Sequence, residues 1–194
     1  MAQTNTVART MHDVGLATWA GGSLMGAIGL NGAASAANDP RDRSRIVNQG
    51  WSSWTPVNLA GIAAHLAGGL QLTRANKGRL AGQQGVARMA TAKTALTAAA
   101  LGTTAYARVL GKKIEDAGDI PVAEGTEPTA GTPSIVSDAQ RQLAVLQWAI
   151  PALTGALLLL NARMGEQQRP KSVIAGMAQR VNLKGSSKKN KKKS

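Results

Sequence analysis

Residues 142–162 read QLAVLQWAIPALTGALLLLNA, and this stretch decides the fold class. It contains no Asp, Glu, Lys or Arg, and it is as long as the roughly 20 residues that an α-helix needs to cross a bilayer. Its run of four leucines from Leu157 to Leu160 makes the helix apolar all round instead of striped at a 3.6-residue period. The stretch therefore predicts a membrane-spanning helix.

Three further stretches extend this pattern along the chain. Residues 14–38 and 46–73 are equally free of charged side chains, and a weaker candidate carries Lys93 and Arg108, which we expect to extend toward opposite interfaces. The sequence thus predicts an all-α fold, an integral membrane four-helix bundle within residues 1–169. Its expected spans cover about residues 14–37, 52–73, 89–111 and 141–162.

The amino-acid composition agrees with closely packed helices. The chain is 43% apolar but only 3% aromatic, and small residues let membrane helices approach one another. It has no cysteine, which excludes a disulfide framework, a thiolate zinc site and a thiol nucleophile. A water-soluble Ala-rich bundle is the alternative. The high content of Ala, Gly and Thr, with more Arg than Lys before the tail, favours a GC-rich bacterial source.

The charges between the spans predict the topology. The loop after the second span carries Arg74, Lys77, Arg79 and Arg88 and no acid, so the positive-inside rule puts it in the cytoplasm. The acidic segment 114–138, with three prolines, is then expected to be an extended external loop. We therefore expect a multi-pass protein of the bacterial plasma membrane with both termini cytoplasmic.

Residues 170–194 have a different character. Residues 172–183 place apolar side chains on one helical face, which predicts an amphipathic segment on the inner leaflet. A disordered basic tail follows, and the net charge of +13 is concentrated there. Anionic lipid headgroups are its expected partner, and nucleic acid is disfavoured because the tail has no aromatic residue to stack on bases. The candidate headgroup ligands are Lys188, Lys189, Lys191, Lys192 and Lys193.

Glycines recur at helical spacing in the first three spans. Spacing of this kind places small residues on one face, where another helix can pack closely. The candidate packing residues are Gly22, Gly26, Gly29, Gly61, Gly68 and Gly102. Such faces serve packing within the bundle or contact with other integral membrane subunits.

Polar residues inside the predicted spans suggest one further site. Asn31, Asn58 and His65 could together bind a transported molecule or a lipid, because an ionisable residue inside a membrane is a functional candidate by default. A haem between His12 and His65 would need both residues at one depth. We expect His12 before the first span and His65 roughly 13 Å deeper, so no cofactor is predicted.

Catalytic patterns are missing from the predicted spans. None of them contains an Asp or Glu to orient a histidine base or relay a proton, and no glycine run matches a nucleotide-binding motif. The sequence also predicts no metal site. We therefore expect a non-catalytic accessory or structural subunit of a larger membrane complex, such as a transporter or respiratory assembly. The alternative is a small transporter or lipid-binding protein that uses Asn31, Asn58 and His65.

Overall fold

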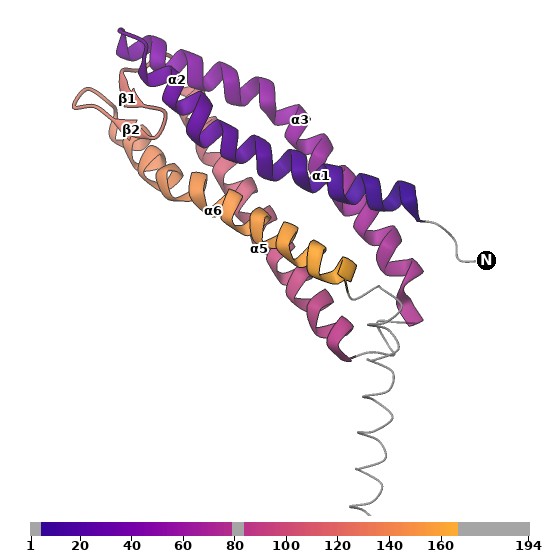
Figure 1. Ribbon diagram of the computed structural model, residues 1–194. Helices are drawn as coiled ribbons and strands as arrows, with labels where there is room; N and C mark the ends of the chain where they lie inside the picture. The colour runs from indigo at the N-terminus through magenta and orange to yellow at the C-terminus, as the bar shows by residue number, and fades with distance from the viewer. Residues whose placement is uncertain (1–4, 79–83, 167–194) are drawn as a thin grey trace, which may run out of the picture.

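A computed structural model of the chain describes residues 5–78 and 84–166. Within these ranges the chain is mostly helical, and four long helices lie side by side as a bundle (Figure 1). The predicted all-α class is confirmed for this part of the chain. The lysine-rich tail from Lys188 to Lys193 and the amphipathic segment before it lie outside the described residues.

The first helix begins earlier than the charge-free stretch suggests. Helix α1 spans Thr6–Met25, and the helical path continues through a π-helical turn, η1 (Gly26–Leu30), into α2 (Asn31–Ser35). Charged side chains at Arg9 and Asp13 stay exposed on the surface, so they do not stop the helix. This early start puts His12 inside α1, where we had expected it before the first span.

Helix α3 also begins earlier than expected. It spans Pro40–Ala75, and the Asp39 side chain caps it by accepting a hydrogen bond from the Arg41 backbone N–H at 2.8 Å. Proline at the first helical position supports this start. Consequently Pro56 lies within the helix and not in its first turn.

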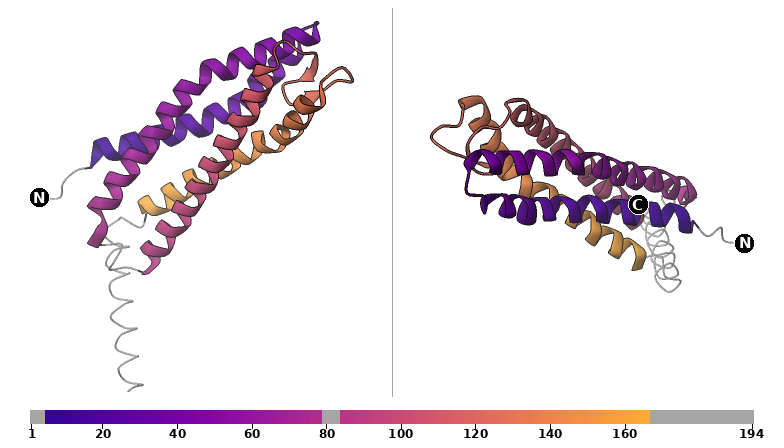
Figure 2. Two further views of the ribbon diagram at one scale, coloured as in Figure 1. Left: turned by 180° about the vertical axis from the view of Figure 1, so that it is seen from behind. Right: turned by 90° about the horizontal axis from the view of Figure 1, so that it is seen from above.

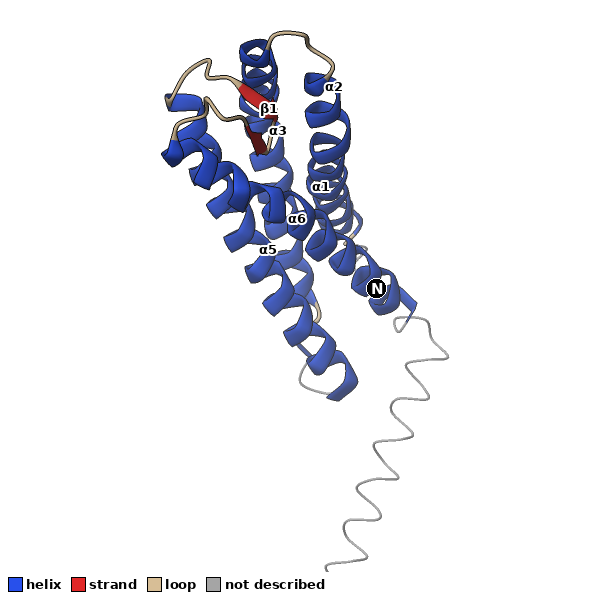
Figure 3. Cartoon of the chain, turned by 90° about the vertical axis from the view of Figure 1, so that its left-hand side faces the viewer, coloured by secondary structure: helices blue, strands red, loops and turns tan. Residues whose placement is uncertain are grey.

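The acidic segment is an ordered cap and not the extended loop that we expected. Helix α5 spans Gln84–Asp116, and α6 spans Ser134–Glu166. Between them, β1 (Val122–Glu124) and β2 (Glu127–Pro128) pair antiparallel at one end of the bundle (Figure 3). Val122 is fully buried, and the buried Gln140 amide donates to the carbonyls of Glu124 and Gly125 at 3.3 and 3.4 Å. The apolar side chain and these bonds hold the segment against the helices.

The helices form two antiparallel hairpins. Helix α1 packs along α3, α5 packs along α6, and α1 also lies against α6, whereas α3 and α5 meet only briefly (Figures 1 and 2). The central core joins the two hairpins through buried residues of α1, α5 and α6. Its members are Leu16, Trp19, Ala100, Ile150 and Leu157.

One helix in the described ranges is long and apolar enough to cross a membrane. This segment is Ser134–Arg163 of α6, and only 17% of its most apolar stretch is buried inside the structure. The core helix of a soluble protein would be mostly buried. The segment contains residues 142–162, so this charge-free stretch lies within a single long helix.

Candidate functional site

Two histidines meet between α1 and α3. The rings of His12 and His65 stack with their centroids 4.0 Å apart and their planes 17° from parallel. The Nδ1 of His12 lies 2.8 Å from the His65 carbonyl oxygen, and the Nδ1 of His65 lies 2.9 Å from the His12 carbonyl oxygen. A carbonyl oxygen only accepts hydrogen bonds, so Nδ1 carries the hydrogen in both rings. The charge of each imidazole then depends on Nε2. The ring is neutral when Nε2 carries no hydrogen and positively charged when Nε2 is protonated as well.

Glycines let the two helices approach closely enough for this pairing. A Cβ added at Gly15 would lie 2.3 Å from the Gly61 carbonyl oxygen, and one at Gly68 would lie 2.4 Å from the Ala8 carbonyl oxygen. Backbone therefore touches backbone on both sides of the histidines, as in small-residue helix contacts generally.

The other two long helices complete the site. Lys93 of α5 contacts the Nε2 of His12 through its ammonium group. Asn161 of α6 donates from its Nδ2 to Asp13 Oδ1 at 3.4 Å. We call these five residues, His12, Asp13, His65, Lys93 and Asn161, the histidine cluster. Lys93, which we expected to extend toward an interface, instead turns inward to a buried acceptor.

The electrostatics of the cluster favour a neutral imidazole at His12. Burial lowers the pKa of His12 below its ordinary value. The backbone hydrogen bond to His65 opposes this shift, and the charge of Lys93 adds to it. A neutral His12 with its hydrogen on Nδ1 keeps a lone pair on Nε2, which is the group that the Lys93 ammonium needs as an acceptor.

A second group of polar contacts lies nearer the β-hairpin. Asn31 donates to Gln147 Oε1 at 2.9 Å and accepts from Trp51 Nε1 at 3.3 Å. Gln147 in turn donates to Thr126 Oγ1 at 3.2 Å. We call these four residues, Asn31, Trp51, Thr126 and Gln147, the polar layer. These contacts tie α2, α3 and α6 to the turn between the two strands.

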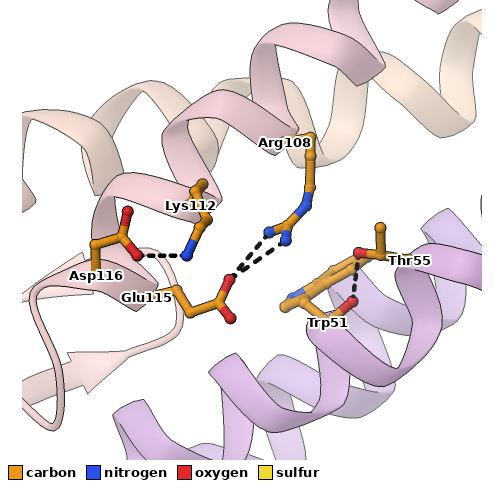
Figure 4. A network of polar contacts seen from close by, with 6 residues as sticks. All are labelled: Trp51, Thr55, Arg108, Lys112, Glu115 and Asp116. Atoms are coloured by element: carbon orange, nitrogen blue, oxygen red, sulfur yellow. Dashed lines mark hydrogen bonds and ion pairs between the residues drawn. The ribbon is translucent and has the colours of Figure 1, made fainter.

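Charged residues gather at the same end of α5. Arg108 pairs with Glu115 at 3.3 Å, and Lys112 pairs with Asp116, on the part of α5 that faces Trp51 of α3 (Figure 4). Arg108 and Lys93 thus belong to opposite ends of the bundle. The stretch of α5 between them contains no charged residue.

The polar residues singled out from the sequence do not form one site. Asn31 belongs to the polar layer through Trp51, and His65 follows Trp51 by fourteen residues of the same helix, or about 21 Å. Asn58 lies between them, and its Oδ1 is buried without a hydrogen-bond partner among the described residues. The structure therefore does not bring these three residues into contact with one another.

The depth argument against a histidine pair is also wrong. Because α1 starts at Thr6, His12 lies at the same level as His65 and touches it. The two rings are in direct contact, however, so a porphyrin does not fit between them as it does between two axial ligands. The described residues contain no group of three or more His, Asp or Glu side chains that could hold a metal ion.

Four of the six predicted packing glycines face a neighbouring helix. A Cβ at Gly61 would meet the Thr18 side chain, and Gly68 touches the α1 backbone. Gly22 lies against the ring of Trp54, and Gly26 against the ring of Trp51. An open apolar groove of about 490 Å³ lies between α3 and the path of α1 and η1, and its lining includes Gly22, Gly26, Gly29, Leu30, Gly50, Trp51 and Trp54.

The remaining two glycines lie away from contacts within the bundle. A Cβ at Gly29 would meet only Met25, one turn earlier in the same helical path, and one at Gly102 would meet nothing within 4 Å. Of the two alternatives, packing within the bundle or contact with another subunit, the first therefore does not apply to Gly29 and Gly102 among the described residues. Gly102 and Ala98, one turn before it, are both exposed on α5.

Comparison of the chain with protein-family models, with curated proteins and with solved structures finds no match. Three features of the molecule itself bear on its function. These are the histidine cluster, the polar layer and the uncharged surface between them.

Proposed function

We propose that the chain is a non-catalytic, multi-pass subunit of a bacterial plasma-membrane complex, and that it packs against other membrane proteins through its helix surfaces. The observation that carries the proposal is α6, whose apolar stretch is long enough to span a bilayer and only 17% buried. In water, so long an apolar surface would be costly to leave uncovered.

The spacing of the two polar groups supports a membrane location. Between the histidine cluster and the polar layer lie about 21 Å of α3 and of α6, and about 28 Å of the α1 to α2 path. None of the described helices carries a charged residue in that interval. A hydrocarbon core is about 30 Å thick, so an uncharged belt of about 21–28 Å covers most of its height.

Large apolar side chains are exposed within the same belt. They occur on all four long helices, which is the distribution expected for a surface that meets lipid or partner helices. The exposed residues in the belt include Leu24, Ile28, Val57, Leu59, Tyr106, Trp148, Leu158 and Leu159.

The exposed Ala98-x-x-x-Gly102 motif supports contact with a partner helix. It lies in the uncharged part of α5, and nothing in the bundle covers Gly102. Motifs of this kind let two membrane helices approach closely. This surface is the one we propose for docking to another subunit.

The charges support an orientation for the bundle. Arg74 and Lys77 lie at the end that holds the histidine cluster, in a stretch of sequence without acids. Basic residues also lie at the β-hairpin end, but several of them pair with acids there, as Arg45 does with Asp42 and Arg108 with Glu115. By the positive-inside rule the histidine cluster faces the cytoplasm in this proposal.

The test is purification of the chain in a mild detergent, followed by mass spectrometry of the proteins, lipids and small molecules that co-purify with it. We expect a stoichiometric membrane protein, and we expect Gly102→Leu to reduce its recovery at least tenfold because the new side chain separates the two helices. Gly155→Leu is the matched control, since a Cβ at Gly155 also meets nothing within 4 Å but the residues four positions away, Pro151 and Leu159, are not small. The control should leave both recovery and thermal stability unchanged.

Two results would count against the proposal. One is a chain that purifies without any stoichiometric protein partner, and the other is equal recovery from Gly102→Leu and the unchanged chain. A bound lipid or small molecule in place of a protein would favour the alternative, a small transporter or lipid-binding protein.

A further inference from the structure

The histidine cluster joins the two helical hairpins at one end of the bundle. His12 and His65 hold α1 to α3 by two hydrogen bonds, and Lys93 reaches His12 from α5. Asn161 of α6 reaches Asp13 of α1 beside them. Helices α3 and α5 contact each other only over a short length. The contacts of the cluster are therefore positioned to control how far the two hairpins separate at this end.

We propose that the histidine cluster is a proton-operated latch, which is closed while both imidazoles are neutral and opens when they take up protons. Opening lets the start of α5 move away from α1 and α3. The proposal rests on the geometry of the cluster and does not depend on the function proposed above.

The hydrogen bonds explain why a proton would open the latch. Nδ1 of His12 already carries a hydrogen, so a further proton can enter only at Nε2. That proton removes the lone pair that accepts from Lys93, and it places an imidazolium directly against an ammonium group. A charge on His65 would likewise lie against a second ring only 4.0 Å away. Protonation therefore breaks one contact and adds repulsion between like charges.

The surrounding charges do not cancel this repulsion. Helix α1 contributes Arg9 and Asp13, whose charges both act on Lys93 of α5. Helix α3 contributes His65, and α6 contributes only the neutral Asn161 to the cluster. Among the described residues of the cluster, Asp13 is thus the one carboxylate beside Lys93, and the positive charge of Arg9 opposes its effect on Lys93.

The direction of the pH dependence follows from proton linkage. Histidines released into water take up protons below their ordinary pKa of about 6.5, whereas the closed latch holds them neutral. The open state therefore binds more protons than the closed state. The population of the closed state is highest at neutral pH and decreases as the pH falls below about 6.5. Each histidine that titrates can change the ratio of open to closed molecules by up to about tenfold per pH unit.

The test is a distance measurement by pulsed electron paramagnetic resonance on the full chain in detergent. Spin labels go on cysteines at Ala75, the last residue of α3, and Ala92 of α5, both of which are exposed. We expect the distance between them to lengthen as the pH falls from about 7.5 to about 5, across the ordinary histidine pKa. Labels at Ile46 and Lys113, near the β-hairpin end, should keep their distance.

Variants assign the change to the histidines. In His12→Asn with His65→Asn, the asparagine Nδ2 can still donate to the facing carbonyl, but neither side chain titrates. We expect the distance between the Ala75 and Ala92 labels to be independent of pH in this double variant. If the double variant loses helical content, His12→Asn alone decides the question, because it should reduce the steepness of the transition.

Three results would overturn the latch. The first is a distance that does not change with pH in the otherwise unchanged chain, and the second is the same change in the double variant, or in His12→Asn alone where that variant decides. The third is an equal change for the labels at Ile46 and Lys113, because that would indicate loss of the whole fold instead of local opening.

Discussion

Trp19→Ala should lower the free energy of unfolding by about 3–5 kcal/mol, the range for removing a buried tryptophan. Trp19 is 0% exposed in the central core. Its Nε1 donates to Thr104 Oγ1 of α5 at 3.1 Å, and its ring meets the edge of His65 at 6.4 Å. The substitution leaves a cavity in the central core, where α1 meets α5 and α6, and it leaves the Thr104 hydroxyl without this donor.

Trp148→Ala is the matched control for this prediction. Trp148 lies on α6 with 52% of its surface exposed, so its removal should change the free energy of unfolding by less than about 0.5 kcal/mol. Titration of the purified chain with a denaturing detergent measures both variants on one scale. Equal losses from the two tryptophans would mean that the core does not lie where α1 meets α5 and α6.

Gly15→Ala should destabilise the bundle by about 1–3 kcal/mol, although alanine normally favours a helix. The added methyl group would lie 2.3 Å from the Gly61 carbonyl oxygen and 2.6 Å from the His65 backbone nitrogen. Both neighbours are backbone atoms, which cannot rotate away as a side chain can. Helices α1 and α3 must therefore separate to accommodate it, and the histidine pair must lengthen its hydrogen bonds.

Gly21→Ala, on the same helix, should stabilise the protein where Gly15→Ala destabilises it. A Cβ at Gly21 meets nothing within 4 Å, so alanine there should stabilise α1 by up to about 1 kcal/mol. The same detergent titration compares the two variants. If Gly15→Ala were as stable as Gly21→Ala, the close contact between α1 and α3 would be wrong.

The sequence was sufficient to predict helices but not where they begin. The absence of charge located the interior of each long helix, because a helix interior in an apolar environment excludes charge. It could not locate the ends, since α1 and α3 both extend through charged turns. The pair Asp39 and Pro40 is a recognisable start signal, an N-cap followed by proline at the first helical position, and it would have predicted the start of α3.

The candidate site depended on these helix ends. With α1 starting at Thr6, His12 comes to the level of His65, and the pairing follows from the glycines on either side. Nothing in the sequence indicates that Lys93 turns inward, because a lysine near the end of an uncharged stretch commonly extends toward water. Its position depends on how α5 packs against α1, which is a property of the tertiary structure.

The ordered structure of the acidic segment also could not be predicted from its amino-acid composition. Three prolines and many acids predict an extended loop, yet Val122 alone supplies a fully buried anchor for the hairpin. The bonds from Gln140 to this segment join residues about fifteen positions apart, so only the folded arrangement of α6 brings them together.

The central claim is that the bundle spans a membrane with the histidine cluster and the β-hairpin on opposite sides. Labelling with a membrane-impermeant thiol reagent on intact cells tests it most directly, because the chain has no cysteine of its own. Single cysteines go at Ala130, beyond the β-hairpin, and at Gly78, beyond the end of α3, both of which are exposed. The account predicts that Ala130→Cys is labelled and that Gly78→Cys is labelled only after the membrane is opened. Equal labelling at both positions, or protection of both until the cells are opened, would contradict it.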